Sequence, residues 1–327
     1  MKIVIPGGSG QVGTVLARAM QGEGHDVVVL SRQPCARPWR VVGWDGATIG
    51  AWSKELDGSD VVINLTGRSV NCRYTAKNRR EILESRVAAT RVLGEAISQA
   101  PRPPRVWLQA STATIYAHRY DAPNDEASGL TGGEETDAPS AWRFSIDVAR
   151  AWEGAFRDAA APHTRKVALR SAMTMSPDPG GVFDTLLGLV RRGLGGRAGN
   201  GRQFVSWIHS EDFVRATQWL IDHDEVEGVV NIAAPHPLPN ADFMRVLRDA
   251  AGARVGLPAT RWMLEIGAVF LQTETELILK SRRVVPGRLL DHGFVFKYPL
   301  WPDAARDLHR QWKLARQRAP LGALGSL

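Results

Sequence analysis

The sequence predicts an α/β fold in which helices cover both faces of a doubly wound parallel sheet. Strand patterns alternate with helical patterns through the first half of the 327-residue chain. These strands are apolar along their whole length, which is typical of parallel sheets covered on both faces. A glycine-rich turn also joins the first strand directly to the first helix, as in a βα unit.

Hydrophobic periodicity places the elements of the first half. Short runs of apolar and β-branched residues predict strands over Ile3–Ile5, Val27–Leu30, Val61–Leu65, Val106–Ala110 and Val167–Arg170. Helical patterns between these strands cover Gln11–Met20, Thr75–Gln99 and Ala141–Ala160. The longest helix carries an apolar stripe at helical spacing and stops before the proline-rich segment at 101–104.

The second half of the chain is less regular. Helical patterns cover Gly180–Arg192, Ser210–Asp222 and Asn240–Ala251, with Ser210 as the expected N-cap of the second. Strands are expected at Phe204–Ile208 and Val229–Ala233. The last residues lack a pattern, so we expect residues 311–327 to fray.

The turn after the first strand reads Gly7-Gly-Ser-Gly10-Gln11-Val12-Gly13. Its glycines fit both a GxGxxG and a GxxGxxG spacing. Glycines let the backbone approach a pyrophosphate, and the helix N-terminus offers free N–H groups and a positive dipole end. The strand–turn–helix context therefore predicts a Rossmann-type dinucleotide site, and the alternative is an ordinary glycine turn.

The second predicted strand ends at Ser31 and Arg32. NAD sites place an acidic residue here, where it accepts the ribose hydroxyls. A hydroxyl and a guanidinium suit the additional 2′-phosphate of NADP, because arginine can hold phosphate with two parallel hydrogen bonds. We therefore expect NADP(H), and the alternative is that Arg32 is simply a solvated strand end.

Composition and charge argue against several classes of protein. The net charge of +7 comes from dispersed basic residues without a nucleic-acid motif, so no specific nucleic-acid partner is expected. The longest apolar candidate, Trp262–Leu279, is interrupted by acidic residues, so no membrane span is expected. Cys35 and Cys72 indicate neither a disulfide framework nor a zinc site. With no secretory signal recognised, we expect a cytoplasmic monomer or homodimer without a metal.

Ordered motifs along most of the chain resemble the extended short-chain dehydrogenase/reductase superfamily. More narrowly, they resemble an atypical, YfcH-like epimerase subgroup with a C-terminal domain of unknown function. The motifs are Asn64–Gly67, Arg73–Thr75, Ser85-Arg86, Thr90-Arg91, Ser206–Asp212, Asn231–Pro235, Pro286–Leu289 and Gly293–Phe296. Two positions depart from the subgroup, since Arg68 stands where it usually has Glu and Tyr74 where it usually has Trp.

The resemblance, together with the glycine spacing, implies a set of cofactor-binding residues. They are Gly7, Gly10, Gln11, Val12, Gly13, Ser31, Arg32, Leu65, Thr66 and Arg73. We expect an NADP-binding domain over residues 1–176, completed by about 203–234. A smaller, mainly helical substrate lobe is expected from residues 177–202 and 235–310, with the substrate in the cleft between the two.

The usual proton-transfer pair of the superfamily is absent. Members with known chemistry use Tyr-x-x-x-Lys on one helix, where the lysine lowers the tyrosine pKa. Anchored on Glu153, the tyrosine position falls on Ser145 and the lysine position on Ala149.

The partner that hydrogen-bonds a substrate oxygen is present by resemblance in Thr112, with Ser111 beside it and Tyr116 as a candidate acid. Tyr116 could instead be a packing residue, and His118 a surface histidine. His209 and Asp212 are more readily explained as ties between the two lobes.

Three functions remain open at this stage. The first is an NADP(H)-dependent oxidoreductase or epimerase-like enzyme for an unidentified small molecule, such as a nucleotide sugar. The second is a non-catalytic NADP sensor or scaffold, which the missing tyrosine and lysine would suit. The third, a nucleic-acid-associated role, rests on charge alone.

Overall fold

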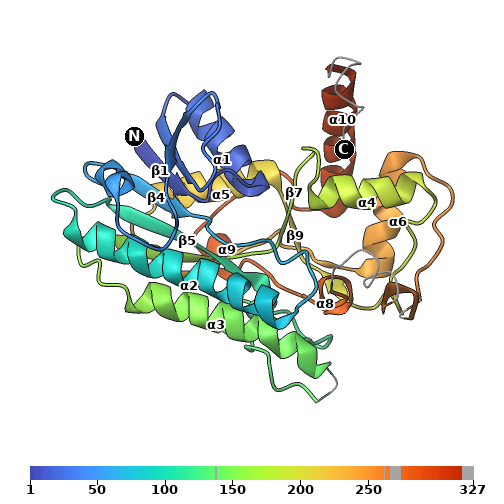
Figure 1. Cartoon of the computed structure of the whole chain (residues 1–327). Coiled ribbons are helices and arrows are strands. Elements are labelled where there is room, and N and C mark those ends of the chain that lie inside the picture. The colour runs from blue at the N-terminus through green and yellow to red at the C-terminus, as the bar shows by residue number, and fades with distance from the viewer. Residues whose placement is uncertain (137, 261, 266–273, 319–327) are drawn as a thin grey trace.

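A seven-stranded parallel sheet has the order β10-β6-β5-β4-β1-β2-β3. The computed structural model describes every residue except 137, 261, 266–273 and 319–327 (Figure 1). The strands are β1 (Lys2–Pro6), β2 (Asp26–Ser31), β3 (Arg40–Gly43), β4 (Val61–Asn64), β5 (Val106–Thr112), β6 (Arg165–Ser171) and β10 (Gly228–Ile232). The chain winds outward from β1 in both directions, which confirms the doubly wound sheet.

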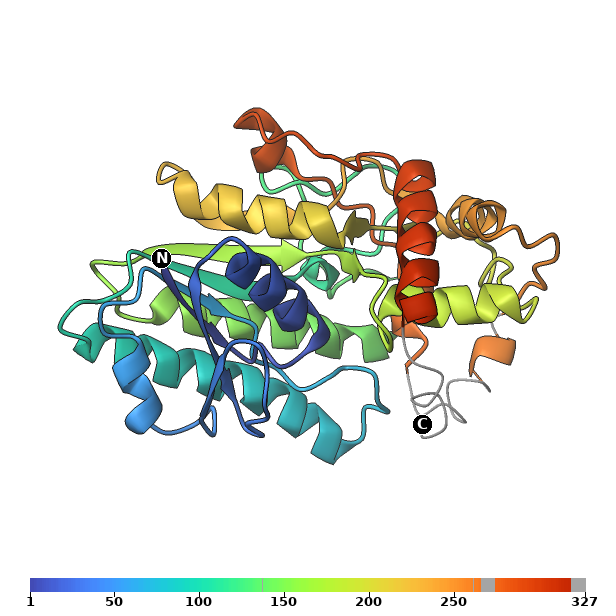
Figure 2. The ribbon, with the colours of Figure 1, turned by 90° about the horizontal axis from the view of Figure 1, so that it is seen from above.

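Helices cover both faces of the sheet because successive strand residues point to opposite sides. Ile3 and Ile5 of β1 share one core with α1 (Gln11–Gly22) and α5 (Ser210–Asp222). Val4, between them, belongs to a second core with α2 (Ala76–Gln99) and α3 (Arg143–Asp158). Figures 1 and 2 show these helix layers on either side of the strands.

The prediction of a single strand over Phe204–Ile208 is wrong, because the strand is interrupted at Ser206. Its first half, β8 (Phe204–Val205), pairs antiparallel with β11 (Leu238–Pro239). Its second half, β9 (Trp207–His209), pairs parallel with β7 (Met173–Met175). The Ser206 hydroxyl donates to the Arg282 carbonyl oxygen (2.6 Å) and accepts from the Val284 N–H (2.8 Å). These contacts with a distant segment hold the chain at Ser206 so that its two sides join different sheets.

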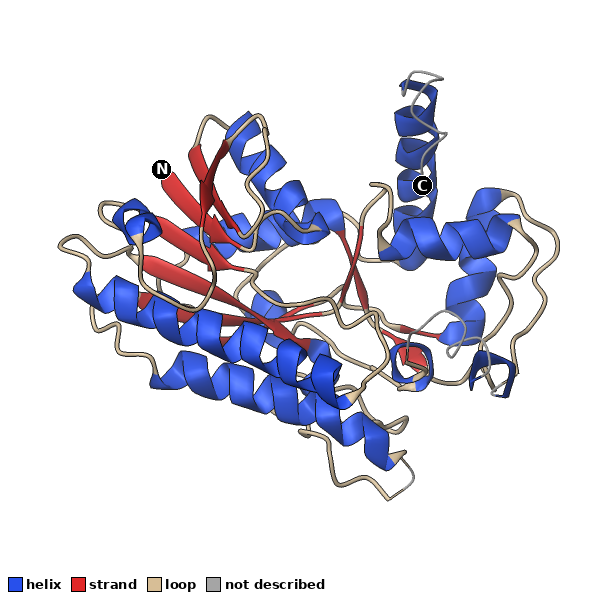
Figure 3. Cartoon of the chain, viewed as in Figure 1, coloured by secondary structure: helices blue, strands red, loops and turns tan. Residues whose placement is uncertain are grey.

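A third core lies to one side of the sheet, among helices α4 (Val182–Arg191), α6 (Asn240–Ala251) and α10 (Trp301–Arg318) (Figure 3). The Trp301 ring stacks on Phe243 with centroids 4.1 Å apart and lies 4.9 Å from Trp207. The Trp301 indole N–H donates to the Phe243 carbonyl oxygen (2.9 Å). Two short helices, α8 (Glu276–Leu279) and α9 (Gly287–Asp291), lie in the chain between α6 and α10.

The C-terminal helix extends further than the sequence pattern indicates, since α10 is helical through Arg318. Trp312 is buried, and its indole N–H donates to Asp184 of α4 at 2.7 Å. Arg316 pairs with the same carboxylate at 3.2 Å. Residues 311–318 therefore do not fray, because one aromatic and one charged contact anchor them. The rest of the expected tail, 319–327, lies outside the described residues.

The start of α5 is tied to the chain that leads into α10. The N-cap is His209 and not Ser210, since the His209 Nδ1 accepts the Glu211 N–H at 3.0 Å. Asp212 is fully buried and accepts the backbone N–H groups of Lys297 (2.8 Å) and Tyr298 (2.7 Å). Asp212 therefore ties the start of α5 to the segment before α10. The expectation that His209 and Asp212 join two lobes stays a prediction.

Both cysteines are free thiols. In the part of the chain that the structure describes, no helix is both long and apolar enough to cross a bilayer. Within the same residues, no three metal-binding side chains come together.

Replacing Asp212 with alanine should lower the free energy of unfolding by about 3 kcal/mol, because two backbone N–H groups lose a charged acceptor that is itself fully buried. Urea denaturation followed by tryptophan fluorescence measures the effect. Asp222→Ala is the matched control on the same helix, since that side chain is 66% exposed, and it should change the free energy by less than about 0.5 kcal/mol. Equal effects of the two substitutions would contradict this account of the α5 contact.

Candidate active site

The turn after β1 requires glycine at several positions. Gly7 has a φ of +73°, and a Cβ there would lie 2.7 Å from the Cα of Thr66. A Cβ on Gly13 would lie 2.4 Å from the Cα of Gly8. The first contact brings the turn against the segment after β4, and the second brings α1 against the turn. Both are closer than any side chain permits, so the glycines fix the shape of the turn.

Gly10 has a different role, because a Cβ there would meet only the Gly7 carbonyl oxygen at 3.9 Å. It is the N-cap of α1, without a side-chain cap and without an acidic residue in the first turn. The first N–H groups of a helix have no partner within that helix, and the dipole favours an anion there. The end of α1 at Gly10 is therefore open, positive in potential and suited to phosphate.

Two polar atoms beside the turn are buried without a hydrogen-bond partner among the described residues, namely Gln11 Nε2 and Thr66 Oγ1. Buried polar atoms are normally paired, so both fit a site that a ligand completes. Ser31, at the end of β2, is buried with its hydroxyl 3.2 Å from both the N–H and the carbonyl oxygen of Gln33. Arg32 beside it is exposed. These residues fit a dinucleotide with a phosphorylated ribose.

The remaining expected cofactor residues surround the same turn. Gly13 is buried, and Val12 and Leu65 are half-buried against the core of that face. Arg73 lies farther out and pairs with Glu274, Nη1 to Oε2, at 3.4 Å. Arg68, the departure from the subgroup, pairs with Glu81 of α2. The Arg68 charge is therefore balanced within the N-terminal part of the chain.

Thr112, Ser111 and Tyr116 follow one another along the end of β5 but have different surroundings. Thr112 is half-buried, and its Oγ1 accepts the Thr114 N–H at 3.1 Å. Ser111 donates to Glu153 at 2.5 Å, and Glu153 holds Arg170 with two hydrogen bonds of 2.7 and 2.8 Å. Ser111 therefore belongs to a buried ionic network, whereas Thr112 has its hydroxyl proton available.

Tyr116 belongs to the same network as Ser111. Only 2% of Tyr116 is exposed, and its hydroxyl donates to Asn231 Oδ1 at 2.9 Å. The Arg170 guanidinium lies over its ring, 5.0 Å from the centroid. Burial raises the pKa of the Tyr116 phenol. These surroundings agree with the packing alternative, so of the three hydroxyls Thr112 is the best placed to meet a substrate.

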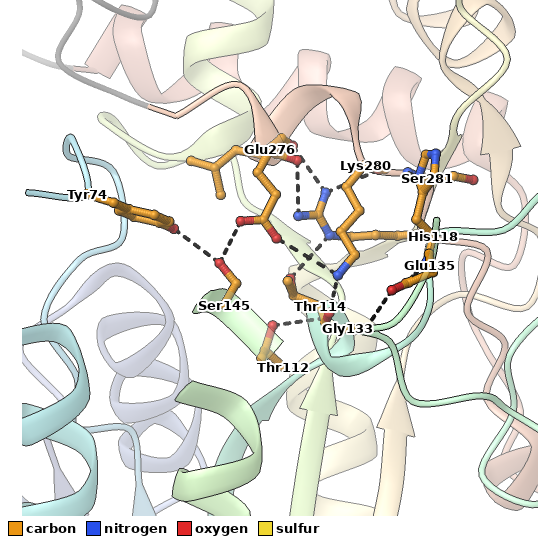
Figure 4. Close-up of polar contacts among 12 residues, drawn as sticks. Tyr74, Thr112, Thr114, His118, Gly133, Glu135, Ser145, Glu276, Lys280 and Ser281 are labelled. Carbon is orange, nitrogen blue, oxygen red and sulfur yellow. Dashed lines mark hydrogen bonds and ion pairs between the residues drawn. The ribbon is translucent and has the colours of Figure 1, made fainter. Parts of the chain in front are cut away.

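The structure brings Tyr74 and Ser145 together with Glu276 and Lys280, a contact that the sequence analysis did not predict (Figure 4). The Ser145 hydroxyl donates to Glu276 Oε2 at 2.6 Å and lies 3.5 Å from the Tyr74 hydroxyl. Lys280 Nζ donates to the Thr114 carbonyl oxygen at 2.8 Å and lies 3.9 Å from Glu276 Oε1. We call Tyr74, Ser145, Glu276 and Lys280 the acid–base cluster.

Burial sets the protonation of this cluster. Glu276 and Lys280 are each only 2% exposed. Burial raises the pKa of the Glu276 carboxyl, against the attraction of Arg282 and Lys280. Burial, with the Arg282 charge added, lowers the pKa of Lys280 to about 8. Both groups therefore titrate closer to neutrality than in water, which is frequent in acid–base sites. The only signal in the sequence was the i,i+4 spacing of the two residues.

His118 helps to hold this segment in place, because its Nδ1 accepts the Ser281 N–H at 2.8 Å. Its backbone N–H donates to Glu135 at 2.7 Å. The histidine is thus engaged with the C-terminal segment, which the surface-loop interpretation did not anticipate.

Comparisons with known proteins agree with this geometry. The model of the NAD dependent epimerase/dehydratase family matches residues 3–233, and that of a domain of unknown function, DUF1731, matches residues 259–308. The chain is 30% identical to the human epimerase family protein SDR39U1 over 302 residues, which cover 91% of this chain and 96% of the human protein.

Two solved structures are similar over nearly the whole chain. The crystal structure of human SDR39U1 (isoform 2) with NADPH has a TM-score of 0.82 at 29% identity and covers 95% of this chain and 99% of that one. The nucleoside-diphosphate sugar epimerase from Corynebacterium glutamicum has a TM-score of 0.73 at 26% identity, covering 97% of this chain and 61% of that one.

The raised pKa of Glu276 predicts a pH-dependent effect of Glu276→Gln on stability. A carboxyl whose pKa is higher in the folded state contributes stability at low pH and loses it as pH rises through the folded pKa. The free energy of unfolding of the variant should therefore improve relative to wild type as pH rises above about 4.3, the ordinary glutamate value. Urea denaturation at a series of pH values measures this. The exposed Glu225→Gln is the control, and a parallel trend in both variants would refute the assignment.

Proposed function

Because this chain belongs to the NAD-dependent epimerase/dehydratase family, we propose that it is an NADP(H)-dependent oxidoreductase or epimerase-like enzyme acting on a small molecule. The observation that carries the proposal is the glycine turn with its open helix end, beside a second strand that ends in Ser31 and Arg32. The NADPH named in the human relative's structure supports the choice of cofactor.

The residues of the turn would hold the pyrophosphate part of the cofactor. The pyrophosphate would meet the backbone N–H groups after Gly10, and the unpaired Gln11 and Thr66 atoms would complete hydrogen bonds around it. Arg32, which forms no ion pair within the described part of the chain, would hold the 2′-phosphate. We assign this role to residues 1–176 with 203–234.

The substrate would lie between this part and the remainder, 177–202 with 235–310. A bound NADPH supplies a hydride to a carbonyl carbon. Thr112 would orient the carbonyl or hydroxyl oxygen of the substrate through its hydroxyl, which accepts from the Thr114 backbone and keeps its proton for donation. A nucleotide sugar is the substrate class to test first, since one similar structure bears the name of a nucleoside-diphosphate sugar epimerase.

Fluorescence titration tests the cofactor assignment, with tryptophans as donors. NADPH should bind with a micromolar dissociation constant and NADH much more weakly. Arg32→Ala should weaken NADPH binding about 10- to 100-fold, the effect of losing hydrogen bonds to a charged phosphate, and leave NADH binding unchanged. Arg157→Ala removes the same charge from a side chain that is 77% exposed at the far end of α3 and serves as control. Equal affinity for the two cofactors would reject NADP, and an unchanged NADPH preference in Arg32→Ala would reject Arg32 as the residue that selects it.

A panel of carbonyl compounds and nucleotide sugars tests for catalysis. We expect at least one compound to oxidise NADPH above background. On that compound Thr112→Ala should lower kcat/KM by about 10-fold or more, and Thr112→Ser should restore most of it, because one hydrogen bond to the reacting oxygen is lost and regained. NADPH binding without turnover of any compound would favour the sensor or scaffold instead.

A further inference from the structure

We propose that Glu276 exchanges a proton with the substrate oxygen through the hydroxyl of Ser145, in place of the absent Tyr-x-x-x-Lys pair, with Lys280 as the group that stabilises the Glu276 carboxylate. The proposal rests on the proposed function and names the group that supplies the proton to the substrate oxygen. Ser145 would touch the substrate, whereas Glu276 and Lys280 act through it.

The position of Ser145 supports this role. It stands on α3 where the alignment anchored on Glu153 expects the tyrosine. In Figure 4, Ser145 and Thr112 come from neighbouring elements, and both lie on the side that faces Glu276 and Lys280. A substrate oxygen held by Thr112 would therefore lie on the same side of α3 and β5 as Ser145. The Tyr74 hydroxyl also lies close to Ser145, with 3.5 Å between the two oxygens.

Glu276 is suited to hold the proton. Its Oε2 is bonded to Ser145 at 2.6 Å, whereas its Oε1 is buried without a hydrogen-bond partner among the described residues. A buried carboxylate oxygen without a partner is costly, and protonation removes much of that cost. The neutral carboxyl can then donate to Ser145 Oγ, which leaves the serine proton free to be donated to a substrate oxygen.

Lys280 is suited to support the ionised form. Its ammonium lies 3.9 Å from Glu276 Oε1, too far for a hydrogen bond but close enough for a strong attraction in a buried site. The Thr114 carbonyl oxygen holds it there. The other titratable or charged side chains that act on these two groups are Tyr74, Glu135, Glu274 and Arg282.

The proton step balances without any further reactant. As the substrate oxygen gains negative charge, the Ser145 proton passes to it and the Glu276 proton passes to Ser145 Oγ. The substrate becomes a hydroxyl compound, the serine is unchanged and Glu276 is left as a carboxylate. In the reverse direction a substrate hydroxyl loses its proton to Ser145, and the serine proton returns to Glu276. Serine is never ionised, so its high intrinsic pKa is no obstacle.

A purely structural role for these residues would also explain their burial, so the first experiment reads protonation directly and needs no cofactor. Infrared spectroscopy of the full chain should show a protonated carboxyl band that persists to higher pH than for glutamate in water, because burial raises the pKa of Glu276. The band should vanish in Glu276→Gln and remain in Glu225→Gln. A spectrum in which Glu276→Gln removes no such band would overturn the proposal, whatever NADPH does.

The second experiment uses the pH profile of NADPH oxidation on a compound from the panel. Ser145→Ala and Glu276→Gln should each lower kcat about 100-fold or more, the usual effect of losing a general acid, with little change in KM. Glu276→Asp should recover part of the rate, and Lys280→Met should shift the alkaline limb of the profile. Wild-type profiles in Glu276→Gln and Lys280→Met would overturn the relay. Thermal unfolding and NADPH titration of each variant separate misfolding, or failure of the cofactor assignment, from loss of the relay.

Discussion

Hydrogen bonds from three separate segments hold the backbone of residues 282–285, and the candidate site depends on them. Ser206 bonds to the backbone on both sides of the Arg283 position, and the Asn124 backbone pairs with Arg283 and Val285 like a short strand. Asn231 donates to the Val285 carbonyl oxygen at 3.0 Å. Because the contacts come from the sheet and its loops, they fix where Glu276 and Lys280 lie relative to β5 and α3.

The sequence predicts well those parts of the structure that depend on neighbouring residues. The strands of the sheet, the turn from Gly7 to Gly13 and the helices that follow each strand all depend on local periodicity or on single backbone requirements. The break at Ser206 is different, since the run from Phe204 to Ile208 is a sound strand by every local criterion. Only the bonds to Arg282 and Val284, more than seventy residues away, turn it into two strands.

The candidate site divides in the same way. The expected cofactor residues of the turn and of the second strand's end follow from local patterns, whereas Leu65, Thr66 and Arg73 are expected from the family resemblance. The acid–base cluster joins Ser145 to Glu276, 131 residues apart, and no pattern around either residue shows the contact. The loss of the tyrosine and lysine was visible in the sequence, but the side chains gathered in their place were not. The departure at Tyr74 is explained by the position of its hydroxyl beside Ser145, which the sequence does not show.

The path of the chain between the core beside α1 and α5 and the core among α4, α6 and α10 has a consequence for folding. The strand β10, at the edge of the sheet, is synthesised only after α4 of the other core, and Phe294 and Phe296, which complete the core beside α1 and α5, come later still. The core beside α1 and α5 therefore needs residues that follow α4 and α6 in the chain, and the core among α4, α6 and α10 needs residues that follow Phe296. A ribosome-bound chain can form β1 to β6 early, but it cannot close either core until the last quarter has emerged, so the two parts are expected to fold as one cooperative unit.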